Sequence, residues 1–172
     1  IPLYLSNECH NICTYCGFSV HNKIERLTLD KDQLMEEVEQ IKRLGFDHIL
    51  LVTREANRKV GVEYFEQVLD WLRPHFSSIS IEVQALEQQD YERLIKRGLN
   101  SVMIYQETYN KETYKSYHPK GKKSNMEYRL ESPDRLGRAG IHRIGLAALL
   151  GLEDWRIDSS FVALHLAYLE RK

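Results

Sequence analysis

Apolar residues recur along this chain in two patterns, one typical of helices and one typical of buried strands. Leu34, Val38 and Ile41 have the spacing of one helical face. Gly45, which follows them, is a natural stop for a helix. The run HILLVT at 48–53 is almost wholly apolar and is instead typical of a buried strand. The two patterns alternate to the end of the chain.

We therefore predict strands and helices in alternation. The expected strands are Ile1–Ser6, His48–Thr53, Ile79–Gln84, Ser101–Gln106 and Ile144–Leu149. The expected helices are Asp30–Leu44, Phe65–Leu72, Asp90–Arg97, a segment around Met126–Ala139 with Pro133 near a start or kink, and an amphipathic Ser159–Lys172. A long polar loop precedes Met126, and its His118 and Lys120–Lys123 are expected to be solvated; the alternative is a role in binding a phosphate or a partner protein.

This order of elements predicts an α/β fold with one parallel sheet and helices outside it, because no hairpin signal joins two strands. An open doubly wound sheet and a barrel both fit the alternation. Neither GxGxxG after the first strand nor GxxxxGK[ST] occurs, which argues against dinucleotide-binding and P-loop folds. A complete eight-stranded barrel needs about 250 residues. About five βα units in 172 residues indicate a single domain, residues 1–172, that is an incomplete barrel lacking its C-terminal part.

The composition of the chain argues against some classes of binding partner. Lysine and arginine number 24 against 25 acidic residues, a net charge of -1, so neither a nucleic-acid nor an acidic-membrane partner is expected. The longest apolar run, Leu146–Leu150, is far shorter than the ~20 residues of a membrane helix. Ile1–Ser6 does not resemble a secretory leader, and we expect a cytoplasmic protein.

The three cysteines of the chain, Cys9, Cys13 and Cys16, all lie in the loop after the first expected strand. An odd number of clustered thiols argues against a disulfide framework. Thiolates at Cys-x3-Cys-x2-Cys spacing suit an iron–sulfur cube, and three ligands leave one iron open to a small molecule. The alternatives are another iron–sulfur carrier, or a structural zinc site completed by His10 or His21, although such sites usually draw on two distant ligand pairs.

Polar residues also gather where the expected strands end, which is where α/β folds place their chemistry. Arg54 and Glu55 follow the second strand, and Glu107 follows the fourth. Glu82 and Gln84 alternate with apolar residues, so they face the barrel lumen if the apolar side meets the helices. We expect a polar lumen near its mouth; the alternative is a set of solvated loop ends.

The cysteine motif, with aromatic Tyr15 before its last cysteine, resembles that of the radical S-adenosylmethionine (SAM) superfamily. The resemblance implies a TIM-like barrel and a [4Fe–4S] cluster held by Cys9, Cys13 and Cys16. It also implies that SAM chelates the open iron and is cleaved to a 5′-deoxyadenosyl radical.

Further stretches resemble one family of this superfamily, the tyrosine lyases of thiamine thiazole biosynthesis, also called 2-iminoacetate synthases. These stretches are LYLSNECHNICTYCGFS, LVTRE, QETYNKETY, HPKGKK, SPDRLGRAGI and GLAALLGL. The resemblance implies cleavage of the Cα–Cβ bond of L-tyrosine to p-cresol and 2-iminoacetate, a low-potential reductant such as flavodoxin or ferredoxin, and thiazole synthase as a partner. Alternatives are the tyrosine lyase of hydrogenase maturation, a deazaflavin synthase-like enzyme, or a non-catalytic Fe–S or zinc module.

The same resemblance implies roles for single residues. Tyr15 would lie by the adenine of SAM, Glu55 would receive its ammonium, Arg129 would bind its carboxylate, and Glu107 would contact it as well. Glu82, Gln84 and Tyr105 are candidates for a SAM or substrate pocket. Arg54 departs from the family pattern, in which glycine precedes the glutamate, and Ala147 replaces a second glycine near the fifth strand.

Overall fold

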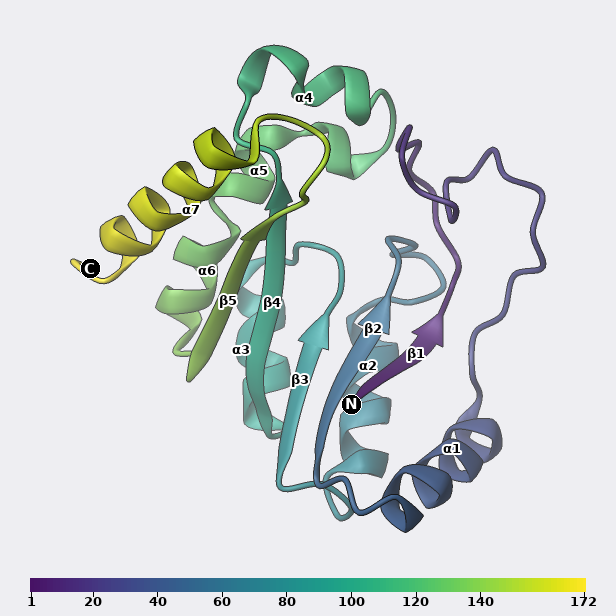
Figure 1. Cartoon of the computed structure of the whole chain (residues 1–172). Coiled ribbons are helices and arrows are strands. Elements are labelled where there is room, and N and C mark those ends of the chain that lie inside the picture. The colour runs from purple at the N-terminus through teal and green to yellow at the C-terminus, as the bar shows by residue number, and fades with distance from the viewer.

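The computed structural model describes residues 1–172 and places five parallel strands in one curved sheet (Figure 1). The strands are β1 (Pro2–Ser6), β2 (His48–Thr53), β3 (Ser78–Glu82), β4 (Leu99–Glu107) and β5 (Arg143–Ala148). They lie in the order β1-β2-β3-β4-β5, and every pair is parallel. Each strand thus pairs with its neighbour in the chain, as in a barrel wall, whereas a doubly wound sheet reverses its order. The predicted partial barrel is confirmed.

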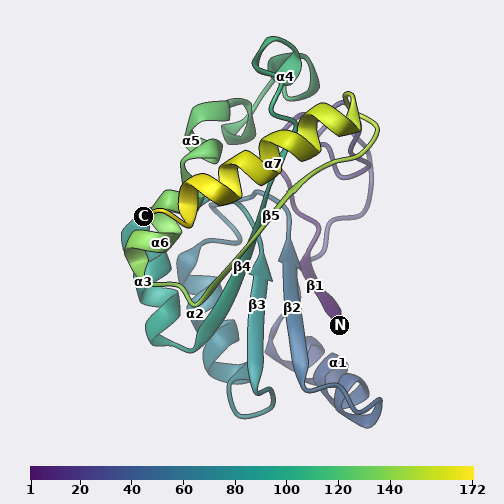
Figure 2. The same ribbon diagram turned by 60° about the vertical axis from the view of Figure 1, so that its left-hand side comes forward.

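The helices cover the outer face of this sheet, because right-handed connections between parallel strands all pass over one side. They are α1 (Lys31–Arg43), α2 (Val62–Leu72), α3 (Gln88–Lys96), α4 (Lys111–Tyr117), α5 (Met126–Leu130), α6 (Ser132–Ala139) and α7 (Trp155–Leu169), with a short 3-10 turn, η1 (Lys122–Ser124). Figures 1 and 2 show α1, α2, α3 and α6 along that outer face and α7 beside β5. No helix is both long and apolar enough to cross a membrane.

The core lies between the sheet and these helices. Leu34, Val38 and Ile41 of α1 are buried there, as their spacing predicted. On β3, Ile79 and Ile81 are 2% and 0% exposed within this core. Because side chains alternate along a strand, Glu82 points to the opposite, lumenal face.

The segment between β4 and α5 differs from the predicted polar loop. Asn110 caps α4 by accepting a hydrogen bond from the backbone of Glu112, and α4 then leads through η1 into α5. Pro133 lies in the first turn of α6, after a break at Glu131 that separates α5 from α6. The predicted helix around Met126–Ala139 is therefore two short helices. This folded segment covers the upper end of the sheet (Figure 1).

The last helix also departs from expectation. It begins at Trp155 rather than near Ser159, and it is not cleanly amphipathic, since Asp158 is its one buried residue. The carboxylate of Asp158 accepts hydrogen bonds from the Thr108 hydroxyl (3.1 Å) and from the backbone of Tyr109 (2.8 Å). These bonds hold the start of α7 against the end of β4. Large apolar side chains of α7 are exposed, among them Ile157, Phe161, Leu164 and Leu166.

Candidate active site

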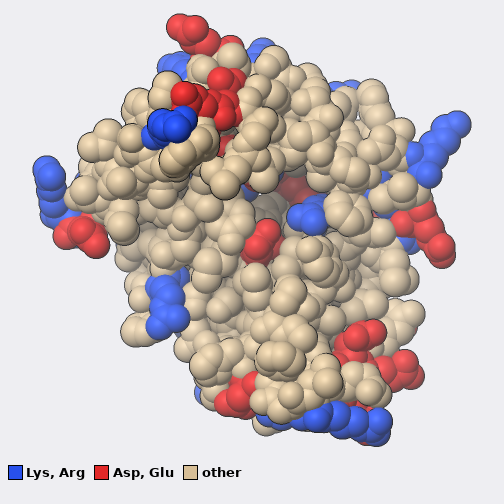
Figure 3. Space-filling view, in the orientation of Figure 1, with Lys and Arg blue, Asp and Glu red and all other residues tan.

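One cavity of about 310 Å³ opens at the carboxyl ends of the strands. All ten residues that the sequence singled out line it: Cys9, Cys13, Tyr15, Cys16, Glu55, Glu82, Gln84, Tyr105, Glu107 and Arg129. Arg54, Met103 and Lys123 are among the further lining residues. The hollow on this face shows both acidic and basic side chains (Figure 3). The cavity is thus small and lined by charges of both signs together with apolar side chains.

The cysteine loop leaves β1 and forms one wall of this cavity. None of the three thiols forms a disulfide, and Cys9 and Cys13 are buried. Burial raises the pKa of the Cys13 thiol to about 11, although the charge of Lys123 opposes this shift. A bound metal is what would keep such a thiol ionised at neutral pH.

Arg26, which the sequence did not single out, holds the cysteine loop in place through hydrogen bonds to its backbone. Its guanidinium donates to the backbone carbonyls of Asn7 (2.7 Å), Phe18 (3.0 Å) and Ser19 (3.0 Å). Both ends of the cysteine loop are therefore tied to one side chain. No local pattern near Arg26 reveals this, because the bonds go to backbone atoms of other segments.

The segment His118–Lys123, predicted to be a solvated loop, is instead packed against the cysteine loop. His118 is 0% exposed, and its Nε2 lies 2.8 Å from the Tyr15 hydroxyl. The Ile12 amide donates to the Lys120 carbonyl at 2.9 Å. Gly121 has φ +97°, and a Cβ there would lie 1.9 Å from Oδ1 of Asn11. The solvated-loop prediction is wrong at His118 and Lys123, because α4 folds this segment back over the thiols.

Glu107 forms the charged centre of the cavity. Its Oε1 lies 2.5 Å from Nζ of Lys123 and 3.8 Å from a guanidinium nitrogen of Arg129. Burial opposes ionisation of Glu107, but the two cations outweigh it and lower the pKa of this carboxyl. Glu107 also has φ +72°, which is unusual for a residue other than glycine and is held here by these neighbours. Local strain of this kind is common at functional sites.

The other two predicted SAM-binding residues are held rigidly. Glu55 is buried, and the side-chain amide of Asn11 donates a hydrogen bond to its carboxylate. The amide of His10 donates to the Glu55 carbonyl at 2.9 Å, which joins the end of β2 to the cysteine loop. Arg129 is also buried, and its Nε donates to the Tyr105 carbonyl at 2.6 Å.

The lumen wall carries Glu82, Gln84 and Tyr105. Burial raises the pKa of Glu82, while the nearby positive charge of Arg54 acts in the opposite direction. Burial likewise raises the pKa of Tyr105. Gln84 donates to the Val60 carbonyl at 2.7 Å, and its side-chain oxygen is buried without a partner. Glu82 and Tyr105 share a side-chain hydrogen bond in the lumen, which lowers the pKa of Glu82 and raises that of Tyr105.

The donor set fits an iron–sulfur cube. Three free thiols line the cavity, which is also lined by acids and several cations. No three His, Cys, Asp or Glu side chains converge as the ligands of a single metal ion do. A cube differs from a single ion in taking each thiolate at a different iron. Cys9, Cys13 and Cys16 could hold such a cluster.

The chain matches the radical SAM superfamily over residues 3–161. With its parallel partial barrel and its three thiols at the carboxyl ends of the strands, the chain belongs to this superfamily. Membership implies a [4Fe–4S] cluster and SAM as cofactors, as the cysteine spacing led us to expect.

Individual proteins of this superfamily are similar to the chain over almost its whole length. The 2-iminoacetate synthase of Escherichia coli (strain K12) is 54% identical over 172 residues, 99% of this chain and 46% of that protein. The structure of HydG, a maturase of the [FeFe]-hydrogenase, superimposes with TM-score 0.97 and 30% identity over 99% of this chain and 39% of HydG. HydG from Carboxydothermus hydrogenoformans superimposes with TM-score 0.95 and 34% identity over 99% and 41%. The chain thus spans less than half the length of these relatives.

Proposed function

We propose that the protein carrying this chain is a radical SAM lyase that cleaves the Cα–Cβ bond of L-tyrosine to p-cresol and 2-iminoacetate for the thiazole of thiamine. The observation that carries this proposal is the 54% identity to a 2-iminoacetate synthase, which extends over 99% of the chain. The cavity supports it, because thiols, acids and guanidinium groups share one small space at the carboxyl ends of the strands.

The cluster and SAM, when bound, supply a radical that abstracts a hydrogen atom from the substrate. We propose that Cys9, Cys13 and Cys16 each bind one iron of the cluster. We also propose that residues 1–172 form the domain that holds this cluster. The hydrogen bonds from Arg26 to backbone carbonyls support this assignment. They keep the cysteine loop in one conformation and so reduce the conformational entropy that the loop loses when the cluster binds.

The remaining polar groups would orient SAM. We propose that Glu55 receives its ammonium and Arg129 its carboxylate, with Glu107 and Tyr15 beside them. A buried carboxylate and a buried guanidinium are strong, directional partners for such groups. Tyr15 is fixed by His118, so its ring cannot turn freely as SAM binds.

The alternative is the tyrosine lyase of hydrogenase maturation, and HydG is a maturase of the [FeFe]-hydrogenase. The near-identical fold favours it, but the identity of 30% to 34% is well below the 54% shared with the 2-iminoacetate synthase. A second cluster in the C-terminal part would favour the hydrogenase enzyme, and its absence would favour the thiamine enzyme.

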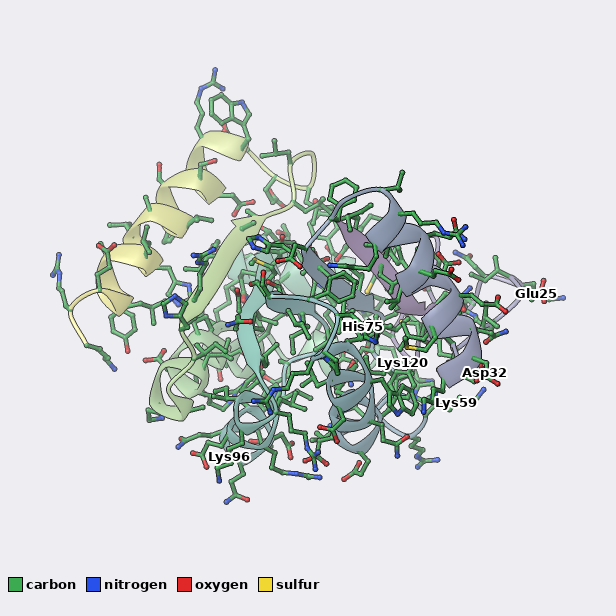
Figure 4. All side chains as sticks on the ribbon, turned by 90° about the horizontal axis from the view of Figure 1, so that it is seen from below. Glu25, Asp32, Lys59, His75, Lys96 and Lys120 are labelled. Atoms are coloured by element: carbon green, nitrogen blue, oxygen red, sulfur yellow. The ribbon has the colours of Figure 1, made fainter.

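An acidic, low-potential protein such as flavodoxin or ferredoxin is the proposed electron donor. Arg58 and Lys122 are exposed and line a small cavity with His10, directly behind the cysteine loop. The side chain of Lys120 is also exposed, and Figure 4 places it on the same half of the molecule as Lys59, away from Lys96. Charge reversal at Arg58 and Lys122 should raise the KM for a protein donor and leave turnover with dithionite unchanged. Equal effects on both donors would contradict this docking site.

Thiazole synthase is the proposed consumer of 2-iminoacetate, and a cytoplasmic setting suits both the free thiols and a reducing donor. Anaerobic incubation of the reconstituted protein with SAM, reductant and L-tyrosine tests the main proposal. We expect p-cresol, 5′-deoxyadenosine and methionine. Formation of 5′-deoxyadenosine without p-cresol would retain the radical chemistry and exclude tyrosine cleavage.

Iron content tests the proposed ligands independently. The reconstituted protein should hold about four irons, and Cys9→Ala, Cys13→Ala or Cys16→Ala should each abolish the cluster absorption. Thr14→Ala, an exposed position within the same loop, is the matched control and should load normally. Tight zinc binding without iron-dependent absorption would instead support a structural zinc module.

A further inference from the structure

Arg54 supplies a cation to the cavity that forms no ion pair with any acid of the protein. Its side chain is half-buried and lines the cavity, and its Nε is buried without a hydrogen-bond partner. The other two cations that line the cavity, Lys123 and Arg129, both pair with Glu107. Arg54 takes part in no such ion pair, so its guanidinium is available to a ligand.

Two aromatic rings fix this guanidinium in place. Its central carbon lies 4.6 Å from the centre of the Phe18 ring and 5.6 Å from that of Tyr4. Stacking of this kind holds a guanidinium by its faces and leaves its N–H edge free for hydrogen bonds. Phe18 belongs to the cysteine loop and Tyr4 to β1, so the position of Arg54 is set by the elements that surround the thiols.

A carboxylate of the opposite wall faces the same space. Val52 of β2 is the register partner of Glu82, and Arg54, two residues beyond Val52, leaves the strand on that face. Arg54 is near enough for its charge to lower the pKa of Glu82, yet the two groups form no ion pair within 4.0 Å. Glu82 and Arg54 thus present one negative and one positive group across an open space.

We propose that Arg54 and Glu82 bind the head group of an α-amino acid substrate, with Arg54 on its carboxylate and Glu82 on its ammonium. This inference rests on the proposed function, in which that amino acid is L-tyrosine. Glu55 and Arg129 form a separate pair of opposite charge in the same cavity, and we have assigned that pair to SAM. One cavity would then hold two amino-acid head groups side by side.

Binding to the reconstituted full-length protein tests the site, with L-tyrosine, tyramine and 3-(4-hydroxyphenyl)propionate as probes. Tyramine lacks the carboxylate, and the propionate lacks the ammonium. Arg54→Gln should weaken L-tyrosine binding about ten- to a hundredfold and leave tyramine binding unchanged. Glu82→Gln should weaken L-tyrosine similarly and leave the propionate unchanged. Arg54→Lys should recover part of the affinity for L-tyrosine, since lysine restores the positive charge but not the planar pair of N–H donors of the guanidinium.

Arg143→Gln is the matched control, because Arg143 is exposed at the start of β5, at the opposite end of the sheet from the cavity. Iron content and SAM affinity should match the unmodified protein in every variant. An Arg54→Gln protein that binds L-tyrosine as Arg143→Gln does, or that loses tyramine affinity equally, would overturn the site. Loss of SAM affinity instead would assign Arg54 to the cofactor and overturn the substrate assignment.

The same preparations separate this inference from the proposed function. An unmodified protein that makes no p-cresol contradicts the proposed function. Normal p-cresol formation, together with unchanged L-tyrosine binding in Arg54→Gln, contradicts the Arg54 site alone.

Discussion

The hydroxyl of Tyr15 lies 2.8 Å from Nε2 of His118, a residue 103 positions further along the chain. The other ring nitrogen, Nδ1, lies 2.9 Å from the Tyr114 carbonyl oxygen, which identifies it as the protonated one. Nε2 then accepts from the tyrosine. A buried neutral histidine therefore joins the cysteine loop to α4, and this arrangement makes the stability of the protein sensitive to acid.

Stability should fall between pH 6.5 and pH 4 because of His118. Burial lowers its pKa from 6.5 to about 4, so the unfolded chain binds this proton more readily than the folded protein. The contribution is complete above pH 6.5 and is lost as the pH falls toward 4. Urea unfolding should show a loss of about 2 kcal/mol between pH 7 and pH 5 that His118→Gln does not share. Exposed His142→Gln is the control and should keep the unmodified slope.

Lys123→Gln should destabilise the protein at neutral pH, because Glu107 would keep only the more distant Arg129 as a counter-charge. We expect a loss of about 2–3 kcal/mol in the free energy of unfolding. The pKa of Glu107 is lowered in the folded state, so the loss should be present at pH 7 and shrink as acid protonates this carboxyl.

Lys122→Gln provides the comparison for this prediction, since Lys122 is exposed on the same turn. Its effect should stay within about 0.5 kcal/mol. Equal effects of the two lysine substitutions would show that Lys123 is an ordinary surface residue.

Gly121→Ala should disturb the junction between η1 and the cysteine loop. The added Cβ would meet Oδ1 and Cα of Asn11 at 1.9 Å and 2.8 Å, and φ is +97°. We expect a loss of about 2–4 kcal/mol and less iron bound after reconstitution. Gly17→Ala meets no atom within 4 Å, lies in the same region, and should cost far less. Thermal unfolding and iron analysis of the pair decide this point.

Glu55→Gln and Arg129→Gln should each weaken SAM binding about ten- to a hundredfold, since each removes one charge-assisted interaction. Iron content should not change, because neither residue is a proposed ligand. Glu127→Gln, an exposed acid on α5, is the control for loss of charge. Unchanged SAM affinity in both variants would refute the proposed SAM contacts.

The sequence by itself determined the order and type of most elements, because these depend on local patterns. The Leu34, Val38 and Ile41 stripe formed α1, and HILLVT formed β2 over the predicted residues. The helix α4 was missed because its residues are polar and its cap, Asn110, precedes no long apolar stripe. The sequence also predicted the iron–sulfur site, since the spacing of the three cysteines is itself typical of iron–sulfur ligands.

The alternation of strands and helices fitted both a barrel wall and a doubly wound sheet, and the chain length only favoured the barrel. The tertiary structure showed the strand order itself, which depends on pairing between distant segments. It also separated Lys123 from Lys122, two adjacent lysines of which one pairs with Glu107 and the other is exposed. The position of Arg54 was likewise decided only by the tertiary structure, since its guanidinium lies against the rings of Tyr4 and Phe18, which come from other segments. Burial and charge pairing arise from residues far apart in the chain, and a local pattern does not record them.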